Sequence, residues 1–417
     1  MMRGSLAPLR LPAYRAWLAG RTVSALGNSI ASIALAFAVL DLTGSARDLG
    51  LVVGSRMLVN VLFLLFGGAL ADRMSKNLLM VGSSVAAFAS QAIVATLVLT
   101  GTATVPLLIL LAAVNGMVGA LAAPASAAIL PQLVPPELRQ QANAVGRLCY
   151  NGAQIIGAPV GGVVVAAVGS GWGLVADACT FLLAALCFLL IKLPPAPAVE
   201  TPVQKKPGVL HDMRVGWTEF RSRTWLWAVV IGFCVVNASL VGGIMVLGPV
   251  IADATIGRQA WGFVLAAETV GMMLGALIAM RLRVRRLLLL GVVCTAFEAL
   301  PLFVLGLRPQ VFFLIGAFFV AGLMIEQFGI AWETTMQEHV PPDKLARVYS
   351  YDMVGSWLAI PAGQVAVGPI GEALGVEQTL IGLSVLVVLA VVGMLCSRDV
   401  RHLEHKLPEP RVEESLA

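Results

Sequence analysis

The chain has 417 residues, of which 59% are hydrophobic and 12% are charged, and its mean hydropathy is +0.89. A soluble globular domain carries about 25% charged residues, so this composition excludes an ordinary soluble protein. A membrane-spanning helix needs about 20 apolar residues, and twelve such helices need roughly 240, close to the hydrophobic share of the chain. The net charge of +5 does not indicate a nucleic-acid partner, because the basic residues lie between the apolar runs.

Twelve apolar runs of helical length follow one another along the chain, six on each side of a polar stretch. The predicted fold is therefore an all-α membrane protein, with twelve transmembrane helices in two pseudo-symmetric six-helix bundles. The predicted spans are 17–40, 49–71, 78–100, 105–130, 143–168, 172–192, 224–250, 260–280, 287–306, 310–333, 348–371 and 378–397.

The two groups of spans are separated by residues 193–223, which contain the polar and proline-rich run PPAPAVETPVQKKPG. Such a run predicts a linker, and the alternating apolar and charged residues at its end predict an amphipathic helix on the membrane surface. We therefore divide the chain into an N-terminal bundle (1–192), this cytoplasmic linker, a C-terminal bundle (224–397) and a cytoplasmic tail (398–417).

Lys and Arg are distributed unequally between the loops. One set of alternate loops, which includes both termini and the linker, carries almost all of them. The opposite set holds only Arg47, Arg258 and Arg308. By the positive-inside rule, both termini are expected in the cytoplasm. Arg outnumbers Lys 22 to 6, which suggests a high-GC genome, and we expect the chain to cross the plasma membrane of a bacterium many times.

The two halves of the sequence repeat. The run VPPELRQQANAV begins at Val134, and VPPDKLARVYSY begins at Val340, 206 residues later. With the same offset Gly157 corresponds to Gly363, and small residues of this kind allow close helix packing. The repetition predicts a parallel duplication of six helices, the architecture of a transporter whose halves rock about a site at the membrane midplane.

After the second predicted span, the sequence GGALADRMSK places Gly68, Asp72, Arg73 and Lys76 in a tight cytoplasmic turn. This turn resembles the signature loop of the major facilitator superfamily, with Ser75 where the pattern of that family has glycine. Asp72 is expected to accept hydrogen bonds at a positive helix N-terminus. The resemblance implies that Gly68, Asp72, Arg73 and Lys76 form a loop that gates the conformational cycle.

The fifth span contains GAPVGG, in which Gly157, Pro159, Gly161 and Gly162 resemble the antiporter motif of exporters in this superfamily. The resemblance implies a pliable helix that packs across the interface between the halves. Further runs, SALGNS, PASAAILPQLVP, VADACTF and MQEHVPPDKLARV, extend over nearly the whole chain and are similar to the subgroup of the enterobactin and macrolide exporters. Export is therefore what the resemblance implies.

Charged side chains inside membrane spans cost roughly 2.5 to 3.5 kcal/mol each, so each one is a functional candidate. Glu268 and Glu326 lie inside spans eight and ten, where a low dielectric favours the neutral form of a carboxyl group, as a proton carrier requires. We expect them to couple transport to protons, with a structural role in helix packing as the alternative. Asp177 is the next candidate, and it and Arg56 are also open to a structural or gating role. Glu298 has less weight, because it lies nearer the outer end of its span.

Polar side chains near the middle of several spans are expected to line a substrate cavity with mixed polar and apolar walls, because the resemblance places these spans around such a cavity. Each of them has a structural alternative, a hydrogen bond between helices. The candidates are Asn28, Ser32, Arg56, Asn115, Asn151, Gln154 and Asn237.

The sequence contains no arrangement of residues that indicates an enzyme. Its six cysteines lie in apolar stretches without a C-x-x-C pair, which argues against a disulfide framework or a thiolate metal site. The tail sequence HLEH lacks the further ligands of a zinc site. The chain also has no G-x-x-x-x-G-K-[ST] phosphate loop, so neither a metal nor another cofactor is expected.

These observations lead to the hypothesis of a proton-coupled secondary transporter that exports an amphiphilic small molecule, such as an antibiotic or a siderophore, by alternating access. The expected partners are the substrate, protons and the lipid bilayer, and the protein is expected to be a monomer. The alternatives are an uptake permease or facilitator of the same fold, and a membrane receptor or scaffold that does not transport.

Overall fold

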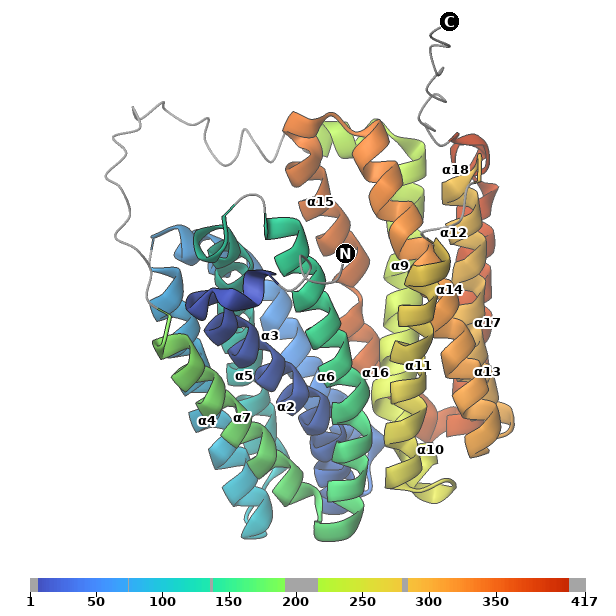
Figure 1. Ribbon diagram of the computed structural model, residues 1–417. Helices are drawn as coiled ribbons and strands as arrows, with labels where there is room; N and C mark the ends of the chain where they lie inside the picture. Colours follow the sequence, from blue (N-terminus) through green and yellow to red (C-terminus); the bar gives the residue numbers. More distant parts are fainter. Residues whose placement is uncertain (1–6, 74, 136–137, 192–216, 280–283, 405–417) are drawn as a thin grey trace, which may run out of the picture.

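The computed structural model describes residues 7–73, 75–135, 138–191, 217–279 and 284–404 of the chain. Over these ranges the protein is a bundle of long helices without a β-strand. The helices of the first half of the chain lie on one side of the bundle and those of the second half on the other (Figure 1). The predicted all-α fold of two helical halves is confirmed.

Each predicted span corresponds to one helix or to consecutive helical segments. Eleven segments are long and apolar enough to cross a membrane, and α3, the remaining span, has 28 residues. After the short η1 (Ala7–Arg10), the first half contains α2 (Pro12–Thr43), α3 (Ala46–Arg73), α4 (Lys76–Leu99), α5 (Val105–Leu133), α6 (Arg139–Val168) and α7 (Ser170–Leu189). The second half contains α9 (Thr224–Gly242), η3 (Gly243–Leu247), α10 (Gly248–Ala254), α11 (Arg258–Ala279), α12 (Leu287–Thr295), η4 (Ala296–Glu298), α13 (Ala299–Leu307), α14 (Val311–His339), α15 (Pro342–Trp357), α16 (Ile360–Leu374), α17 (Val376–Cys396) and α18 (Arg398–His402).

Three spans of the second half are interrupted, each just before a proline. Proline lacks the N–H group that would bond the carbonyl four residues earlier. Pro249 therefore leaves the carbonyl of Met245 without this bond, and Met245 lies inside the π-helical turn η3. Pro301 follows the 3-10 turn η4 in the same way, and Pro361 follows the break between α15 and α16. Such interruptions let a span bend where a continuous α-helix would not.

The two ends of the bundle differ in their connections. At one end, which we call the short-loop end, between one and five residues join consecutive helices, as at 44–45, 100–104 and 169. The described residues with positive φ all lie in these connections and all are glycines, which adopt this conformation without a steric penalty: Gly44, Gly101, Gly169, Gly257 and Gly375. The opposite end, which we call the basic end, carries the loops that are rich in Lys and Arg.

At the basic end, where the sequence predicts a tight turn, α3 ends at Arg73 and α4 begins at Lys76. Ser75 caps α4, because its Oγ accepts a hydrogen bond at 3.2 Å from the backbone N–H three residues later. Serine is among the strongest N-cap residues, so it has a defined role where the family pattern has glycine. The predictions for Gly68, Asp72 and Arg73 concern side-chain positions outside the described residues.

Most of the predicted linker, 192–216, and the end of the tail, 405–417, also lie outside the described residues. The last part of the linker is helical at residues 217–221. There Trp217 and Phe220 stack with their ring centroids 5.7 Å apart. Trp217 also packs against Tyr351 of α15, with a centroid distance of 5.5 Å, so this part of the linker is attached to the second half.

The buried apolar side chains are shared between the halves only on one side of the bundle. The largest core cluster includes Phe37 of the first half and Trp261 of the second, both toward the short-loop end. Toward the basic end, a cluster around Trp17 belongs to the first half and a separate cluster around Trp332 belongs to the second. The halves are therefore packed together at the short-loop end and have separate cores at the basic end.

Candidate functional site

A cavity of about 700 Å³ lies between the two halves. Its walls come from α2 to α7 of the first half and from η3 and α11 of the second. Arg21 and Tyr150 line it toward the basic end, and Ser32 and Ala158 line it nearer the short-loop end. Because the halves share a core only at the short-loop end, the cavity extends toward the basic end.

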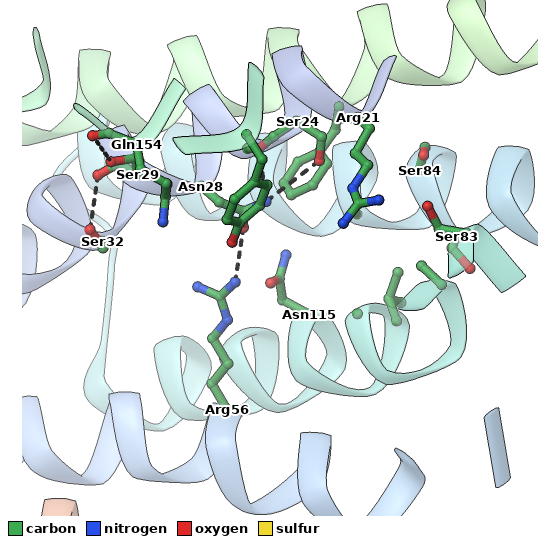
Figure 2. Close-up of a pocket in the computed structure, with 18 of the residues that line it drawn as sticks. Arg21, Ser24, Asn28, Ser29, Ser32, Arg56, Ser83, Ser84, Asn115 and Gln154 are labelled. Atoms are coloured by element: carbon green, nitrogen blue, oxygen red, sulfur yellow. Dashed lines mark hydrogen bonds between the residues drawn. The ribbon is translucent and has the colours of Figure 1, made fainter. Parts of the chain in front are cut away.

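Five polar side chains of α2 line the cavity, namely Arg21, Ser24, Asn28, Ser29 and Ser32. The spacing of three or four residues between Arg21, Ser24, Asn28 and Ser32 places these four on one face of the helix. Asn28 Nδ2 donates to the backbone oxygen of Ser24 at 2.9 Å, and Ser32 Oγ donates to the backbone oxygen of Ser29 at 2.8 Å. These bonds hold the side chains along α2, around the space that Figure 2 shows.

Arg56 of α3 points toward α2, with Asn115 of α5 beside it (Figure 2). Its Nη2 donates to Asn28 Oδ1 at 3.1 Å. The charge of Asp177 of α7 acts on the guanidinium group, but the two groups do not form a direct ion pair. Asp177 is 1% exposed, and Thr180 Oγ1 donates to its backbone oxygen at 2.7 Å. Asp177 is therefore a buried supporting charge and does not line the cavity.

Arg21 lies nearer the basic end and points into the same space as Arg56 (Figure 2). Its guanidinium carbon is 5.2 Å from the ring centroid of Trp17 and 5.8 Å from that of Tyr150, which are cation–π distances. Among the described residues, no carboxylate lies within ion-pair distance of Arg21 or Arg56. The first half therefore places two unpaired cationic groups on the cavity wall.

The wall on the second half is formed by Met245 of η3 and by Leu265, Glu268 and Thr269 of α11. The backbone of α11 is packed tightly against α14, where a Cβ on Gly322 would collide with the backbone oxygen of Glu268. Within the described part of the chain, the Glu268 carboxylate has no ion-pair partner. The second half therefore places an unpaired carboxyl group opposite the two arginines.

The other two carboxyl groups considered in the second half do not line the cavity. Glu326 of α14 is half-buried and experiences the charges of Arg147 from the first half and of Glu333. Glu298, which the sequence places nearer the end of its span, is 3% exposed and lies near the middle of the interrupted span, in η4. Its Oε1 has no hydrogen-bond partner in the described structure, and it is near enough to Glu268 for their charges to interact.

The glycines of the predicted exporter motif all lie on α6 and pack against two neighbouring helices, α2 and α11. A Cβ on Gly157 would lie 2.7 Å from Cβ of Ser29, and one on Gly161 would lie 3.0 Å from Cα of Ile30, both on α2. A Cβ on Gly162 would lie 2.7 Å from the backbone oxygen of Arg258 at the start of α11. The motif therefore packs α6 against both halves at once, and α6 continues as a helix through the motif's Pro159.

Polar groups also join the halves at the short-loop end. Arg258 of the second half forms a bidentate ion pair with Asp41 at the end of α2, in which Nη1 donates to Oδ2 at 2.9 Å. The same guanidinium donates from Nε to Asp253 at 2.7 Å and lies 4.6 Å from the ring centroid of Phe37. We call the Asp41–Arg258 pair the short-loop clasp. A second contact, Ser45 Oγ to Glu372 at 2.9 Å, joins α16 to the connection between α2 and α3.

The structure brings most of the predicted cavity residues together and separates two of them. Asn237 donates to the backbone oxygen of Ser356 at 3.0 Å, so it forms a bond between helices, the structural alternative. Asn151 lies on α6 and is not part of the wall. Those that do line the cavity are Asn28, Ser32, Arg56, Asn115 and Gln154.

The sequence analysis did not identify several wall residues, including Arg21, Ser24, Ser83, Ser84, Ser126, Tyr150 and Thr269. A signal for some of them is present, because Arg21 and Ser24 continue the helical spacing of Asn28 and Ser32. The remaining serines lie in helices whose small residues are spread over several faces, and only the fold shows which face meets the cavity. The sequence analysis also did not identify the short-loop clasp, because its two residues are more than 200 positions apart and only the fold brings them together.

The cavity is suited to a small molecule with polar and apolar parts. Its volume falls in the range of ligand sites, about 300 to 1,000 Å³, and Met80, Val118, Phe181 and Phe188 add apolar surface to the polar groups. In the part of the chain that the structure describes, no group of three or more His, Cys, Asp or Glu side chains is placed to hold a metal ion.

Comparison with known proteins places these features in a family context. A family model described as Major Facilitator Superfamily matches residues 17–364. The chain is 25% identical over 408 residues to the multidrug efflux pump Tap of Mycolicibacterium fortuitum, covering 94% of this chain and 96% of that protein. It is 26% identical over 429 aligned positions to the enterobactin exporter EntS of Escherichia coli (strain K12), covering 97% of this chain and 96% of that protein.

Solved structures show the same fold at low sequence identity. A bacterial homologue of the human lysosomal transporter Spinster, in an inward-facing and unoccupied conformation, superposes with a TM-score of 0.75 at 16% identity, covering 95% of this chain and 98% of that one. The nucleoside transporter NupG gives a TM-score of 0.70 at 12% identity, with coverage of 92% and 98%. A bacterial homologue of the iron transporter ferroportin, in an inward-facing state, gives 0.69 at 14% identity, with coverage of 92% and 98%.

Proposed function

Because the chain belongs to the major facilitator superfamily, it is a multi-pass membrane transporter of small molecules and not an enzyme, and we propose that it exports an amphiphilic molecule in exchange for protons. The direction is supported by the relatives that are named an efflux pump and an exporter. The GAPVGG motif, which resembles the antiporter motif of exporters in this superfamily, also supports export, and its glycines place α6 at the interface between the halves.

The observation that carries the proposal is the position of Glu268. It is the described carboxyl group of the second half that faces the cavity, and it has no ion-pair partner among the described residues. A carboxyl group in a site of low dielectric can hold either a proton or a cationic group, but it does not hold both well. Competition between proton and substrate at one carboxyl group is sufficient to couple their movements in opposite directions.

The contacts between the halves support an alternating-access cycle. In this conformation the shared core and the short-loop clasp close one end, while the cavity extends toward the other. Opening the short-loop end requires the clasp to break and the basic end to close. The charges of Arg147 on α6 and Glu326 on α14, which belong to opposite halves and interact at a distance, are suited to attract each other in that second state.

The excess of Lys and Arg supports placing the basic end in the cytoplasm. In this orientation the conformation described here is open toward the cytoplasm, where an exporter collects its substrate. Glu326 then belongs to the cytoplasmic closure, and the buried charge of Asp177 acts on Arg56. We therefore assign proton coupling to Glu268 first, with Glu326 and Asp177 as the next candidates.

Transport in proteoliposomes tests the proposed function. Vesicles that contain the purified protein are loaded with a candidate substrate, and exchange is compared with and without an imposed pH difference. An exporter of the proposed kind exchanges substrate in both cases and concentrates it only when the pH difference is present. Exchange without concentration, even when the pH difference is imposed, supports a facilitator instead, and the absence of any exchange over a wide panel of amphiphiles supports a receptor or scaffold.

A further inference from the structure

We propose that the cavity binds a zwitterionic amphiphile, with its anionic group at Arg56 and Arg21 and its cationic group at Glu268. This inference deepens the proposed function by naming the chemical class of the substrate, and it rests on that function only for the direction of movement. It is carried by the arrangement of charge on the two walls of the cavity.

The wall of the first half is a surface of hydrogen-bond donors. The guanidinium group of Arg56 has five N–H donors, of which the structure uses one, on Asn28. Arg21 points into the same space (Figure 2), where it lies over the rings of Trp17 and Tyr150 and forms no ion pair among the described residues. Asn115 and the hydroxyl groups of Ser83 and Ser84 border this space. Planar guanidinium groups with free donors favour a carboxylate or another oxygen-rich anion.

The wall of the second half has the opposite charge. Glu268 faces the cavity between Leu265 and Thr269 and lacks a cationic partner in the described structure. Charged groups without partners are costly inside a membrane protein and usually mark a substrate or ion pathway. Arg56 and Glu268 come from different halves, so a ligand that contacts both is bound by each of the two bodies that move in the cycle.

The charge balance distinguishes a zwitterion from simpler ions. A simple cation would satisfy Glu268 but leave the free donors of Arg56 and Arg21 without an acceptor, and Arg21 would repel it, whereas the charge of Asp177 partly offsets that of Arg56. A simple anion would satisfy Arg56 but be repelled by ionised Glu268, so it would bind best together with a proton, which predicts movement in the same direction and not exchange. A zwitterion satisfies both walls, and its cationic group displaces the proton from Glu268 as exchange requires.

The apolar residues of the wall define the remainder of the ligand. Met80, Val118, Met245 and Leu265 line the cavity together with the charged groups. Methionine side chains are flexible and polarisable, so they adapt to ligands of different shape. The expected ligand is therefore an amphiphile with an apolar body that separates the two charges, and it is not a small, fully polar zwitterion such as an amino acid.

Equilibrium binding of three related dyes to the purified full-length protein in detergent tests this inference. Rhodamine B is a zwitterion at neutral pH, its ethyl ester is the matched cation, and fluorescein is an anion on the same xanthene scaffold. We expect the wild type to bind rhodamine B about tenfold more tightly than the ester, the effect of one charge-assisted hydrogen-bonded contact, and more tightly than fluorescein. Equal or tighter binding of the ester or of fluorescein, or binding of none of the dyes, would overturn the inference.

Variants locate the selectivity. Arg56→Gln should reduce the preference for rhodamine B over its ester from about tenfold to about twofold, the loss of most of one charge-assisted contact, while Arg47→Gln, an exposed arginine on the same helix, should leave it unchanged. Glu268→Gln should weaken binding of the ester and strengthen binding of fluorescein. Because each result is a ratio of affinities within one variant, a lower fraction of folded protein does not imitate it. Arg21→Gln changes an exposed side chain and should also reduce the preference for rhodamine B over its ester, so it replaces Arg56→Gln if that variant does not fold.

The same dyes separate this inference from the proposed function. Binding in detergent involves no gradient and no direction, so it tests the charge complementarity alone. A preference for rhodamine B without transport driven by a pH difference would support the zwitterion site and contradict proton-coupled export. Transport driven by a pH difference together with a preference for the ester would support proton-coupled export and contradict the zwitterion site. An Arg56→Gln variant that keeps the full wild-type preference would refute the assignment of the anionic group to the arginines.

Discussion

The short-loop clasp gives the structure a conformational prediction whose size can be worked out. Arg258 and Asp41 form a bidentate pair, but their side chains are 22% and 42% exposed, so solvent screening limits the pair to about 1 kcal/mol. The contact of Arg258 with Phe37 adds roughly 0.5 to 1 kcal/mol. Arg258→Gln should therefore remove about 1 to 2 kcal/mol from the closed short-loop state, a shift of roughly 5- to 30-fold in the ratio of the two conformations.

Distances between nitroxide labels at Thr102 and Gln310, exposed residues at the short-loop end of each half, measure this ratio by pulsed electron spin resonance. Arg258→Gln should increase the population with the longer distance, and Asp41→Asn should do so by less, because the contact with Phe37 remains. Arg308→Gln, an exposed arginine at the same end, is the control. If Arg258→Gln gives the same distance distribution as Arg308→Gln, the clasp does not stabilise the closed state and the reasoning is refuted.

Three further predictions concern packing, the basic-end turn and orientation. Gly162→Ala should slow transport in proteoliposomes, because its Cβ would lie 2.7 Å from the backbone oxygen of Arg258. The control Gly152→Ala, on the same helix, meets nothing within 4 Å and should match the wild type. Asp72→Asn should slow transport while leaving dye affinity unchanged, because a charge at a helix terminus contributes about 0.3 to 2 kcal/mol to the state that contains it; transport at the wild-type rate would show that the turn has no gating role. In a cysteine-free background, Thr255→Cys should react with an impermeant thiol reagent added outside cells and Gln204→Cys should not, and the reverse pattern would invert the proposed orientation.

The positions of the spans follow from the sequence because each needs only a long apolar run, and every predicted run corresponds to helical structure. The interruptions of the spans were not predicted. Their cause is local, since Pro249, Pro301 and Pro361 remove one backbone bond each, but Pro159 lies inside α6 without breaking it. Whether a proline interrupts a helix therefore depends on the packing around it, which the sequence of the span does not contain.

Part of the cavity lining could also be predicted from the sequence. Asn28 and Ser32 could be chosen because polar side chains in a membrane span need a partner or a cavity, and they line one. Asn237 meets the same criterion, but its amide bonds a backbone oxygen of another helix. Glu298 shows the reverse difficulty, since it is given less weight for its place nearer the end of a span, whereas the fold buries its side chain within reach of the charge of Glu268. Single helices do not show which face meets a neighbour.

The proposed coupling through Glu268 is the central claim, and accumulation driven by a pH difference in proteoliposomes tests it most directly. One charge moving through 100 mV is worth about 2.3 kcal/mol, or about fiftyfold in concentration ratio, so the effect is large enough to measure. With rhodamine B, or whichever of the three dyes the protein binds, the wild type should accumulate dye when the pH difference is imposed. Glu326→Gln should reach the same concentration ratio more slowly, because it keeps Glu268 but loses the attraction to Arg147. Glu268→Gln should retain exchange at equilibrium and show no accumulation. Accumulation by Glu268→Gln at the wild-type level would contradict the account and place the proton on another group.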